Sequence, residues 1–502
     1  MSCKSRNGFV SARRRLASAT DLMHVLKRAD TFLKPKIKSL SSPDATPLPL
    51  QESIFLGDMP PVGTAYEPQQ PATKKLKKII EENYYSAAFE SAIKTVSQQK
   101  VPELDRIKTL YQYYYYVDAL VTWIPEIRVW DWNGEILHER TCYLRITQFY
   151  YYFNQQELEA LQSPVAPVKG ALLSQISLWL REFAIEWGAF LATPASNKYL
   201  ESFKYAPEYA WQDYEKEPQQ YETFNAYFAR QFKNIEVQRP VAQTDDDRVI
   251  VFPAESTFVG QWTISTGVGD PLPAPPSIVV KHIEWPIEEL LQDTKYKDDF
   301  AGGTFCHSFL NTYDYHRQHT PVAGKVLEAK FIPGQAYLEV NLEKLNKDGE
   351  EAENSDVANA VIPQRYLDAE DPTGYQFVQC RGLLVLETAI GKVAVLPMGM
   401  AQVSSVVFVT PKAEGQKPIV LTPKEKKGLD YDQQVGLLNK KIAKALVGKH
   451  LSKGEMFSFF QFGGSDCVVV FERKANVNVT ATVGLHYPIR SQYAISNINK
   501  LL

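Results

Sequence analysis

The hydrophobic pattern of this chain changes at the dipeptide Arg239-Pro240. Before this point, apolar residues recur at three- and four-residue spacing, which predicts amphipathic helices. After it, short runs rich in Val, Ile and Phe are separated by Gly, Pro and charged turns, which predicts strands. The residue before a proline disfavours helical backbone, so the dipeptide marks a boundary. We therefore predict an α+β fold, with a helical domain over residues 76–240 and a β-rich domain over 241–502.

Within this division, individual elements follow from the spacing of apolar residues. Two polar stretches, the acidic 344–356 and the lysine-rich 411–449, are expected to be surface insertions. Helices are expected at 103–123, 172–191 and 221–232. Strands are expected at 249–252, 278–280, 336–340, 383–388, 392–396, 405–409, 467–471 and 477–483.

Residues 1–75 are predicted to form a largely disordered tail. The first 20 residues hold five basic side chains and no acidic one, and eight prolines lie between residues 35 and 71. Such a segment buries too little apolar surface to order itself. The basic stretch also resembles a transit peptide, so a mitochondrial location stays open beside the expected cytoplasmic one.

Composition excludes several classes of protein. A net charge of −3 over 502 residues argues against a dedicated nucleic-acid binder, so no nucleic-acid partner is expected. The five cysteines are scattered and make no C-x-x-C pair, which argues against a zinc site or a disulfide framework. No run approaches 18 apolar residues, so no transmembrane helix is expected.

Chemically reactive side chains gather around two histidines. His316 and His319 lie three residues apart, beside Asp314, Arg317 and two tyrosines. Histidine is the usual general base near neutral pH, although a pair of core histidines would show the same pattern. A metal site with Asp314 is the remaining alternative. Because a strand points residues three apart to opposite faces, we expect no metal here.

The second stretch is Gly463-Gly464-Ser465, which is followed by an apolar run. By itself it predicts only a loop that enters a strand. Together and in this order, the two stretches resemble the phosphatidylserine decarboxylase family of pyruvoyl-dependent enzymes. The resemblance covers roughly residues 220–502 and is carried by 224–230, 239–240, 251–256, 315–324, 333–334 and 453–465.

A shorter resemblance lies in the helical region. Trp187-Gly188-Ala189-Phe190-Leu191 and Thr193-Pro194-Ala195-Ser196 are similar to an N-terminal helical domain in a soluble branch of the same family. That branch includes decarboxylases of free aromatic amino acids, such as tryptophan decarboxylase.

The resemblance implies a self-made cofactor. Ser465 is the implied nucleophile, His319 its base and Glu255 the carboxylate that orients the base. Attack on the Gly464 carbonyl cuts the chain between Gly464 and Ser465, which leaves a β chain of residues 1–464 and an α chain of residues 465–502. The α chain then begins with a pyruvoyl group derived from Ser465, and no metal or diffusible cofactor is implied.

The implied reaction is loss of CO2 from an α-amino carboxylate. The pyruvoyl carbonyl forms a Schiff base with the substrate amine and acts as an electron sink. His316 is the candidate for this step, either placing the carboxylate or protonating the carbanion. Two positions depart from the family pattern: Glu255 stands where an Asp is usual, and Asp466 stands where Thr or Ser is usual. An unprocessed homologue is therefore an alternative.

Three functions follow. The favoured one is decarboxylation of a free amino acid, with an aromatic side chain as one option. The second is a phosphatidylserine decarboxylase at a membrane surface, where Lys74, Lys75, Lys77 and Lys78 would contact anionic headgroups. The third is a non-catalytic scaffold that is never cleaved. The cleaved α and β chains are expected to stay together, and a homodimer is left open.

Aromatic residues make up 12% of the chain and are densest at 111–116 and 148–153. Both runs lie in the predicted helical domain, so packing of that domain is their expected role. The alternative is that a few of them line the entrance to the pyruvoyl site and favour an aromatic substrate.

Overall fold

The computed structural model of the protein describes residues 56–498 with internal gaps. Pro47–Leu502 form one compact unit. The predicted tail over residues 1–55 and the predicted nucleophile Ser465 lie outside the described residues. The gaps are 102, 128, 133–134, 139–140, 166–171, 218–219, 268–274, 345–364, 370–372, 400–405, 411–418 and 465.

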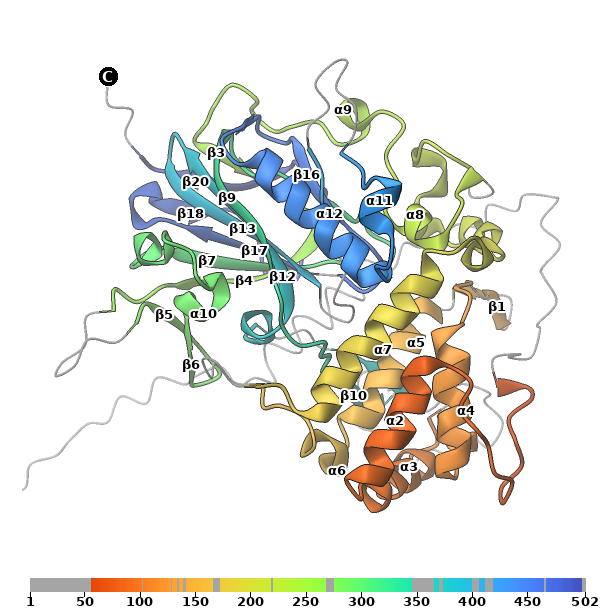
Figure 1. Ribbon diagram of the computed structural model, residues 1–502. Helices are drawn as coiled ribbons and strands as arrows, with labels where there is room; N and C mark the ends of the chain where they lie inside the picture. Colours follow the sequence, from red (N-terminus) through yellow and green to blue (C-terminus); the bar gives the residue numbers. More distant parts are fainter. Residues whose placement is uncertain are drawn as a thin grey trace, which may run out of the picture. The chain divides into compact units, whose positions relative to one another are not determined.

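The described part of the chain combines helices with antiparallel sheets, as the α+β prediction requires (Figure 1). The segment before Pro240 is mostly helical, although it also holds an unpredicted hairpin, β1 (Val129–Trp132) and β2 (Glu135–His138). Its helices are α2 (Pro71–Glu82), α3 (Ser86–Gln98), α4 (Leu110–Val121), α5 (Thr141–Phe153), α6 (Gln156–Glu159), α7 (Gln175–Leu191), α8 (Phe224–Phe228) and α9 (Ile235–Gln238).

The helix predicted over 221–232 is shorter than expected. Only α8 forms, capped by the Thr223 side chain, which accepts a hydrogen bond from the backbone N–H of Ala226. Beyond it, the carbonyls of Ala229 and Arg230 accept hydrogen bonds from the Arg317 guanidinium at 2.8 and 3.2 Å. The chain therefore turns toward the histidine segment instead of continuing the helix.

The two aromatic runs pack the helical region. Tyr113 of α4 and Tyr152 of α5 meet edge to face with ring centroids 4.8 Å apart. Phe149 of α5 stacks on Phe183 of α7 at 4.1 Å. Tyr116 is also fully buried in this cluster. The predicted packing role is thus confirmed, and neither run lines the two pockets described below.

The predicted disordered tail is wrong for residues 56–75. Leu56 is fully buried, and the Tyr66 hydroxyl donates a 2.7 Å hydrogen bond to Asp118. The backbone N–H groups of Gln69 and Gln70 bond to the same carboxylate, which anchors the entry to α2. The proline-rich composition therefore misled the prediction, because one buried acceptor holds three donors of this segment.

A large antiparallel sheet dominates the second half. Among the described residues it has eight strands in the order β15-β9-β12-β13-β17-β7-β4-β19. The middle strand β17 is buried along its whole length. The strands are β15 (His450–Leu451), β9 (Gly324–Ile332), β12 (Cys380–Thr388), β13 (Gly391–Gly399), β17 (Asp466–Phe471), β7 (Thr304–Phe309), β4 (Ser256–Thr263) and β19 (His486–Tyr487).

Smaller sheets and short helices surround this sheet. The order β14-β16-β8 joins β14 (Val406–Phe408), β16 (Met456–Phe460) and β8 (Arg317–His319), and β18-β20-β3 joins β18 (Val477–Val479), β20 (Gln492–Ser496) and β3 (Val249–Val251). Hairpins pair β5 (Ser277–Val280) with β6 (Ile283–Pro286) and β10 (Asn341–Lys344) with β11 (Arg365–Asp368). The helices here are α10 (Ile287–Leu291), α11 (Pro423–Lys426) and α12 (Tyr431–Leu446).

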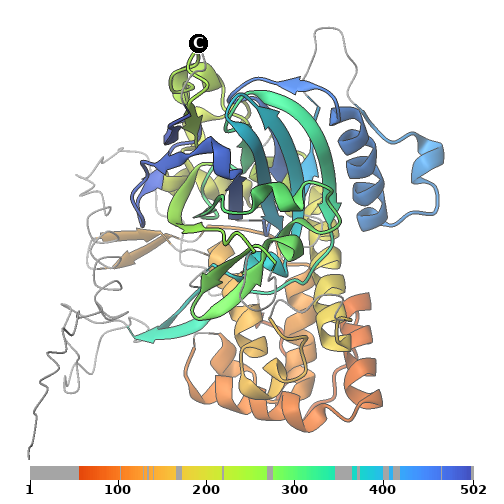
Figure 2. The ribbon, with the colours of Figure 1, turned by 90° about the vertical axis from the view of Figure 1, so that its left-hand side faces the viewer.

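Two expectations for the second half are wrong. The segment 336–340 forms no strand, because the side chain of Asn154 bonds the backbone of Leu338 and Val340 in place of a neighbouring strand. The stretch 411–449 is not a surface insertion where it is described, since α12 packs on β9 and β14 (Figures 1 and 2). Asn439 fixes α12 there by bonding the backbone of Val406 and Phe408.

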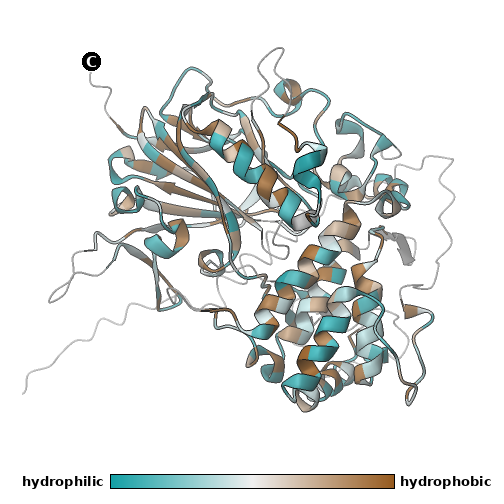
Figure 3. Cartoon of the chain, viewed as in Figure 1, coloured by the Kyte–Doolittle hydropathy of each residue, from teal (hydrophilic) through white to brown (hydrophobic). Residues whose placement is uncertain are grey.

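Burial joins the two halves of the chain. One core cluster takes in side chains from the helices and from the sheet, from Leu56 to Ala494. Figure 3 shows apolar colours along the sheet strands and alternating with polar ones on α12. The boundary at Pro240 therefore marks a change of secondary structure and not a break in the core. In the described part of the chain, no helix is both long and apolar enough to cross a membrane.

Candidate active site

His319 is buried at the end of β8. Its backbone N–H donates to the Pro253 carbonyl at 2.8 Å, and its strand pairs with β16 at Met456. The imidazole Nδ1 lies 2.7 Å from the Gly454 carbonyl oxygen. Since a carbonyl only accepts hydrogen bonds, Nδ1 carries the proton and Nε2 carries the lone pair. Burial lowers the pKa of His319 to about 3, so the ring is a neutral base at neutral pH.

The turn that supplies the Gly454 carbonyl is rigidly held. Gly454 has φ +77°, and a Cβ there would lie 2.5 Å from a Val241 methyl group, so only glycine fits. The neighbouring Lys453 is buried, and its ammonium group donates to the carbonyls of Gln243, Asp246 and Val249 at 2.5, 2.9 and 3.2 Å. The orientation of His319 is thus set by backbone, not by a carboxylate.

The predicted pairing of Glu255 with His319 is not made. Both carboxylate oxygens of Glu255 are bound by the Arg239 guanidinium, at 2.6 and 2.8 Å. This bidentate geometry is the strong form of an ion pair, and no hydrogen bond joins Glu255 to His319. The extra methylene relative to the expected Asp gives no contact with His319 in the structure.

Arg490 occupies the place expected of an orienting group. Its Nε donates to the Gly454 oxygen at 3.0 Å and lies 3.3 Å from His319 Nδ1. Its Nη1 pairs with the exposed Glu236 at 2.8 Å. The charge of Arg490 further lowers the pKa of His319. Nothing in the local sequence around residue 490 predicts this contact, which joins positions 171 residues apart.

His316 lies in a different environment from His319. Its ring stacks on Phe228 of α8 with centroids 3.8 Å apart, and its Nε2 lies 3.2 Å from the Thr312 carbonyl. Nε2 is therefore the protonated nitrogen and Nδ1 is an acceptor. Nδ1 is buried and has no hydrogen-bond partner among the described residues. Burial lowers the pKa of this ring to about 3 as well.

The loop before the cleavage position is packed among aromatic rings. Phe462 contacts Trp187, Phe224 and Phe228 edge to face, and its N–H donates to Asn225 at 3.3 Å. Gly464 is buried, and a Cβ there would lie 2.4 Å from the Phe460 ring. Phe460 in turn donates its backbone N–H to the His316 carbonyl at 2.8 Å. The structure thus brings the Gly464 end of the loop beside His316.

A pocket of about 430 Å³ adjoins this loop. Gln461 and Phe459 form one side of it, and Arg317 and Lys216 supply positive charge. The Arg317 side chain also lies over the Phe459 ring, with its Cζ 5.1 Å from the ring centroid. The lining also includes Arg230 and one acidic side chain, Glu215, so three cations face one anion and the site suits an anionic group.

After the cleavage position, Asp466 starts β17 and is fully buried. Its Oδ2 accepts a 3.0 Å hydrogen bond from Gln376 and lies 3.4 Å from His307 Nε2. His307 was not predicted to take part in the site. The signal that could have found it is a histidine in the middle of a strand, β7, that is buried from residue 305 to residue 308.

Among the described residues, no metal site surrounds the two histidines. Across the described ranges, no three His, Cys, Asp or Glu side chains form a group able to hold a metal ion. His316 and His319 make unrelated contacts and do not converge on Asp314, whose carboxylate pairs instead with His486 at 2.8 Å. His316 Nδ1 is a buried acceptor with no hydrogen-bond partner among the described residues, so it can accept a hydrogen bond from the amine of a substrate beside position 465.

Comparison with known proteins identifies the family. The family model for phosphatidylserine decarboxylase matches residues 224–490, more than half of the chain. The chain is 24% identical over 300 residues to phosphatidylserine decarboxylase proenzyme 3 of Schizosaccharomyces pombe, covering 60% of this chain and 24% of that protein. It is 23% identical over 295 residues to the proenzyme of Fusobacterium nucleatum, covering 58% and 74%.

A third relative is phosphatidylserine decarboxylase proenzyme 2 of Oryza sativa, which is 25% identical over 301 residues, 59% of this chain and 37% of that protein. The match therefore spans well under half of the yeast and rice relatives and about three quarters of the bacterial one. It includes the histidine segment, Gly464 and Arg490. The chain belongs to the phosphatidylserine decarboxylase family.

Proposed function

We propose that the chain cuts itself between Gly464 and Ser465 and then decarboxylates the serine headgroup of phosphatidylserine. The observation that carries the proposal is the buried, neutral His319, whose Nδ1 donates to the Gly454 carbonyl and whose Nε2 is thereby left as the basic nitrogen. Family membership and the names of the relatives support the reaction and the substrate.

For the cut, His319 Nε2 takes the proton of the Ser465 hydroxyl. The oxygen attacks the Gly464 carbonyl carbon, the C–N bond breaks, and the proton passes to the leaving amine. Elimination of the resulting ester releases the Gly464 carboxylate, and addition of water releases ammonia and completes the pyruvoyl group. The Tyr315 hydroxyl lies 3.3 Å from this same Nε2, so the Ser465 hydroxyl replaces it as the partner of Nε2 when the proton is transferred.

For the decarboxylation, the pyruvoyl group supplies an electron sink. His316 contributes an acceptor, because Nε2 donates to Thr312 and leaves the Nδ1 lone pair open. This favours a contact with the substrate ammonium group. Placement of the carboxylate, one of the two predicted roles, needs a donor and is not favoured by this tautomer. Arg317 and Lys216 are the groups suited to the phosphodiester of the headgroup.

A free aromatic amino acid is the second candidate substrate. The observation that favours it is the contact of Trp187 with Phe462, at 5.6 Å between ring centroids, since Trp187 lies in the segment that resembles the amino acid decarboxylases. An aromatic wall contributed by α7 would suit an aromatic side chain. A membrane-peripheral location follows from the first substrate and a cytoplasmic one from the second.

The test begins with intact mass of the purified protein. Wild type should yield a fragment of residues 465–502 that is blocked to Edman sequencing, and Ser465→Ala should remain a single chain. CO2 release is then measured from phosphatidylserine in mixed micelles, from L-tryptophan and from L-tyrosine. A wild-type chain that stays uncut under all conditions would overturn the proposal and favour the scaffold. If CO2 is released only from the amino acids, a free aromatic amino acid replaces phosphatidylserine as the proposed substrate.

A further inference from the structure

Decarboxylation of an α-amino carboxylate consumes one proton for each CO2 released. The residues on either side of the proposed pyruvoyl position, Gly464 and Asp466, are both buried. A buried site of this kind needs a route by which a proton arrives from solvent. This requirement rests on the proposed function. The polar side chains next to residue 465 are the candidates for the route.

A chain of polar contacts leads away from Asp466. His307 Nε2 lies 3.4 Å from Asp466 Oδ2, and His307 Nδ1 lies 2.9 Å from the Thr373 hydroxyl. Gln376 donates to Asp466 at 3.0 Å and its amide nitrogen lies 3.2 Å from His307 Nε2. All four residues are buried. They come from three elements, β17, β7 and the segment that leads into β12.

These four polar side chains lie among apolar residues. Side chains alternate along β17, so Asp466 lies on the same face as Val468 and Val470. Those two valines belong to an apolar cluster with Trp285, Phe377 and others. Burying polar groups among apolar ones is costly unless they are bonded to one another. The four residues therefore form a connected path through an apolar face.

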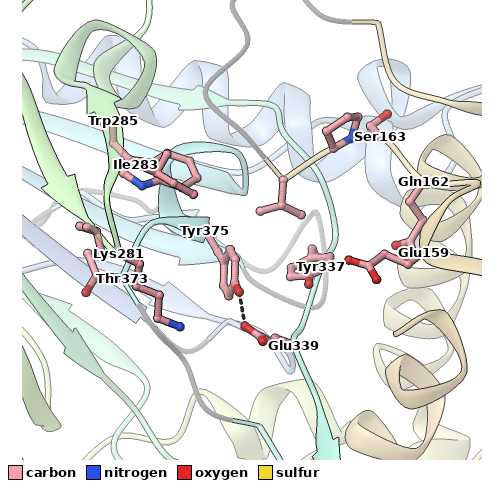
Figure 4. Close-up of a pocket in the computed structure, with 13 residues that line it drawn as sticks. Glu159, Gln162, Ser163, Lys281, Ile283, Trp285, Tyr337, Glu339, Thr373 and Tyr375 are labelled. Carbon is pink, nitrogen blue, oxygen red and sulfur yellow. Dashed lines mark hydrogen bonds between the residues drawn. The ribbon is translucent and has the colours of Figure 1, made fainter. Parts of the chain in front are cut away.

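The path ends at a pocket of about 380 Å³ (Figure 4). Thr373 lies in its wall next to Tyr375, and the opposite wall holds Glu159 and Gln162. Glu159 and Lys281 are exposed, so the pocket opens to solvent. Gly374, with φ +129°, packs its Cα against the Trp285 indole, where a Cβ would approach to 2.9 Å. This contact holds Thr373 at the inner wall.

We propose that Thr373, His307 and Asp466 conduct the proton that replaces CO2 on the substrate. Water in the pocket gives a proton to the Thr373 hydroxyl, which passes its own to His307 Nδ1. His307 gives its Nε2 proton to Asp466, and the Asp466 carboxyl protonates the substrate carbon that has lost CO2. Rotation of the His307 ring restores the starting tautomer, so one proton enters and one leaves in each cycle.

The decisive variants are Thr373→Val, which removes the hydroxyl at equal volume, and Thr373→Ser, which keeps it. Thr373→Val should still cleave itself, but its kcat should fall about tenfold and its solvent deuterium isotope effect on kcat should rise. Thr373→Ser should behave as wild type. Tyr375→Phe is the matched control, because it changes the same pocket wall and removes a hydrogen bond to Glu339 outside the path.

A second readout does not depend on activity. In the uncleaved Ser465→Ala chain labelled with 15N-histidine, the ring N–H of His307 should exchange with water faster than in the Ser465→Ala, Thr373→Val double variant. His307→Gln assigns the signal by removing it. This experiment also covers a Thr373→Val chain that folds but loses activity for another reason.

The outcomes separate the two proposals. If wild type cleaves and releases CO2 while Thr373→Val matches it in kcat, isotope effect and ring exchange, the proton path is wrong and the proposed function stands. If Thr373→Val and Thr373→Ser lose kcat equally, the residue acts through packing and the path is wrong. If wild type never cleaves, the proposed function fails, and the exchange measurement alone decides whether Thr373 couples His307 to solvent.

Discussion

The two sides of the cleavage position differ in what holds them. Before it, Gln461, Phe462 and Gly464 form a loop packed among rings of α7 and α8, including Phe228, which stacks on His316. After it, β17 pairs with β13 on one edge and with β7 on the other. In the proposed function, the first side supplies the groups for the cut, and the second supplies the strand pairing of the large sheet and the proposed path to solvent.

This difference would let the fold survive the proposed cleavage. The α chain would keep the pairing of β17, and β19 and β20 would remain paired with β4 and β3. Breaking one peptide bond at the end of a central strand therefore removes no strand pairing of the large sheet. The predictions below perturb one side at a time, beginning with the largest expected effect.

His319→Ala should slow self-cleavage by about 100-fold or more, the usual contribution of a general base. The ratio of cut to uncut chain over time measures it. His450→Ala is the control, since His450 is exposed on β15. If His319→Ala is cut at the wild-type rate, His319 is not the base. The proposal that the residues before the cleavage position perform the cut is then wrong.

Gly464→Ala and Val469→Ala form a pair across the cleavage position. Gly464→Ala forces a methyl group to within 2.4 Å of Phe460, which costs roughly 1–3 kcal/mol and misplaces the scissile carbonyl, so cleavage should nearly stop. Val469→Ala leaves a cavity beneath β17 and should lower the free energy of unfolding by about 2–3 kcal/mol while cleavage continues. Urea unfolding measures the free energy of unfolding, and intact mass measures the extent of cleavage. If both variants lose cleavage equally, the two sides of the cleavage position do not differ in their effect on the cut.

Arg490→Gln should slow cleavage about tenfold, because the Gly454 carbonyl, which accepts from His319 Nδ1, loses its second donor, the Arg490 guanidinium. Arg490→Lys should recover part of the rate. The matched control is Glu236→Gln, which breaks only the outer ion pair of Arg490 with an exposed partner and should leave the rate within about twofold. If Glu236→Gln and Arg490→Gln slow cleavage equally, Arg490 acts through its ion pair and not on His319.

Glu255→Gln should change the cleavage rate by less than about threefold, because Glu255 binds Arg239 and makes no contact with His319. The expected loss is in stability, since the largely buried Arg239 pair is broken. Rates are followed by intact mass and stability by thermal unfolding. A loss as large as that of His319→Ala would restore Glu255 as the orienting carboxylate.

Cleavage should be almost unchanged between pH 7 and pH 5. A histidine base works only when neutral, and burial holds the pKa of His319 at about 3, below this whole range. A histidine with its ordinary pKa would be mostly protonated at pH 5 and would lose about 30-fold in rate. Initial rates of fragment formation at the two pH values distinguish these cases, with far-UV circular dichroism confirming that the fold persists.

The sequence alone determined that the chain combines helices with sheets, whereas the roles predicted for Ser465, His319 and His316 stay predictions. The switch from helical to alternating periodicity placed the change of secondary structure at Pro240, because local backbone preference and burial repeat with fixed periods. Gly464 was named only as the cleavage position that the family resemblance implies, and the structure adds that the Phe460 ring leaves no space for a Cβ there. The resemblance to the family rested on ordered motifs, and the family model confirms it.

Only the tertiary structure decided which side chains meet. Glu255 was expected on His319 but is bound by Arg239, while Arg490 reaches His319 from 171 residues away. Asp118 orders a segment predicted to be a tail. His307 and Asp466 come together because β7 and β17 are neighbours in the sheet. Periodicity says which residues are buried, but partner choice depends on strand register and on long-range packing, which no local pattern encodes.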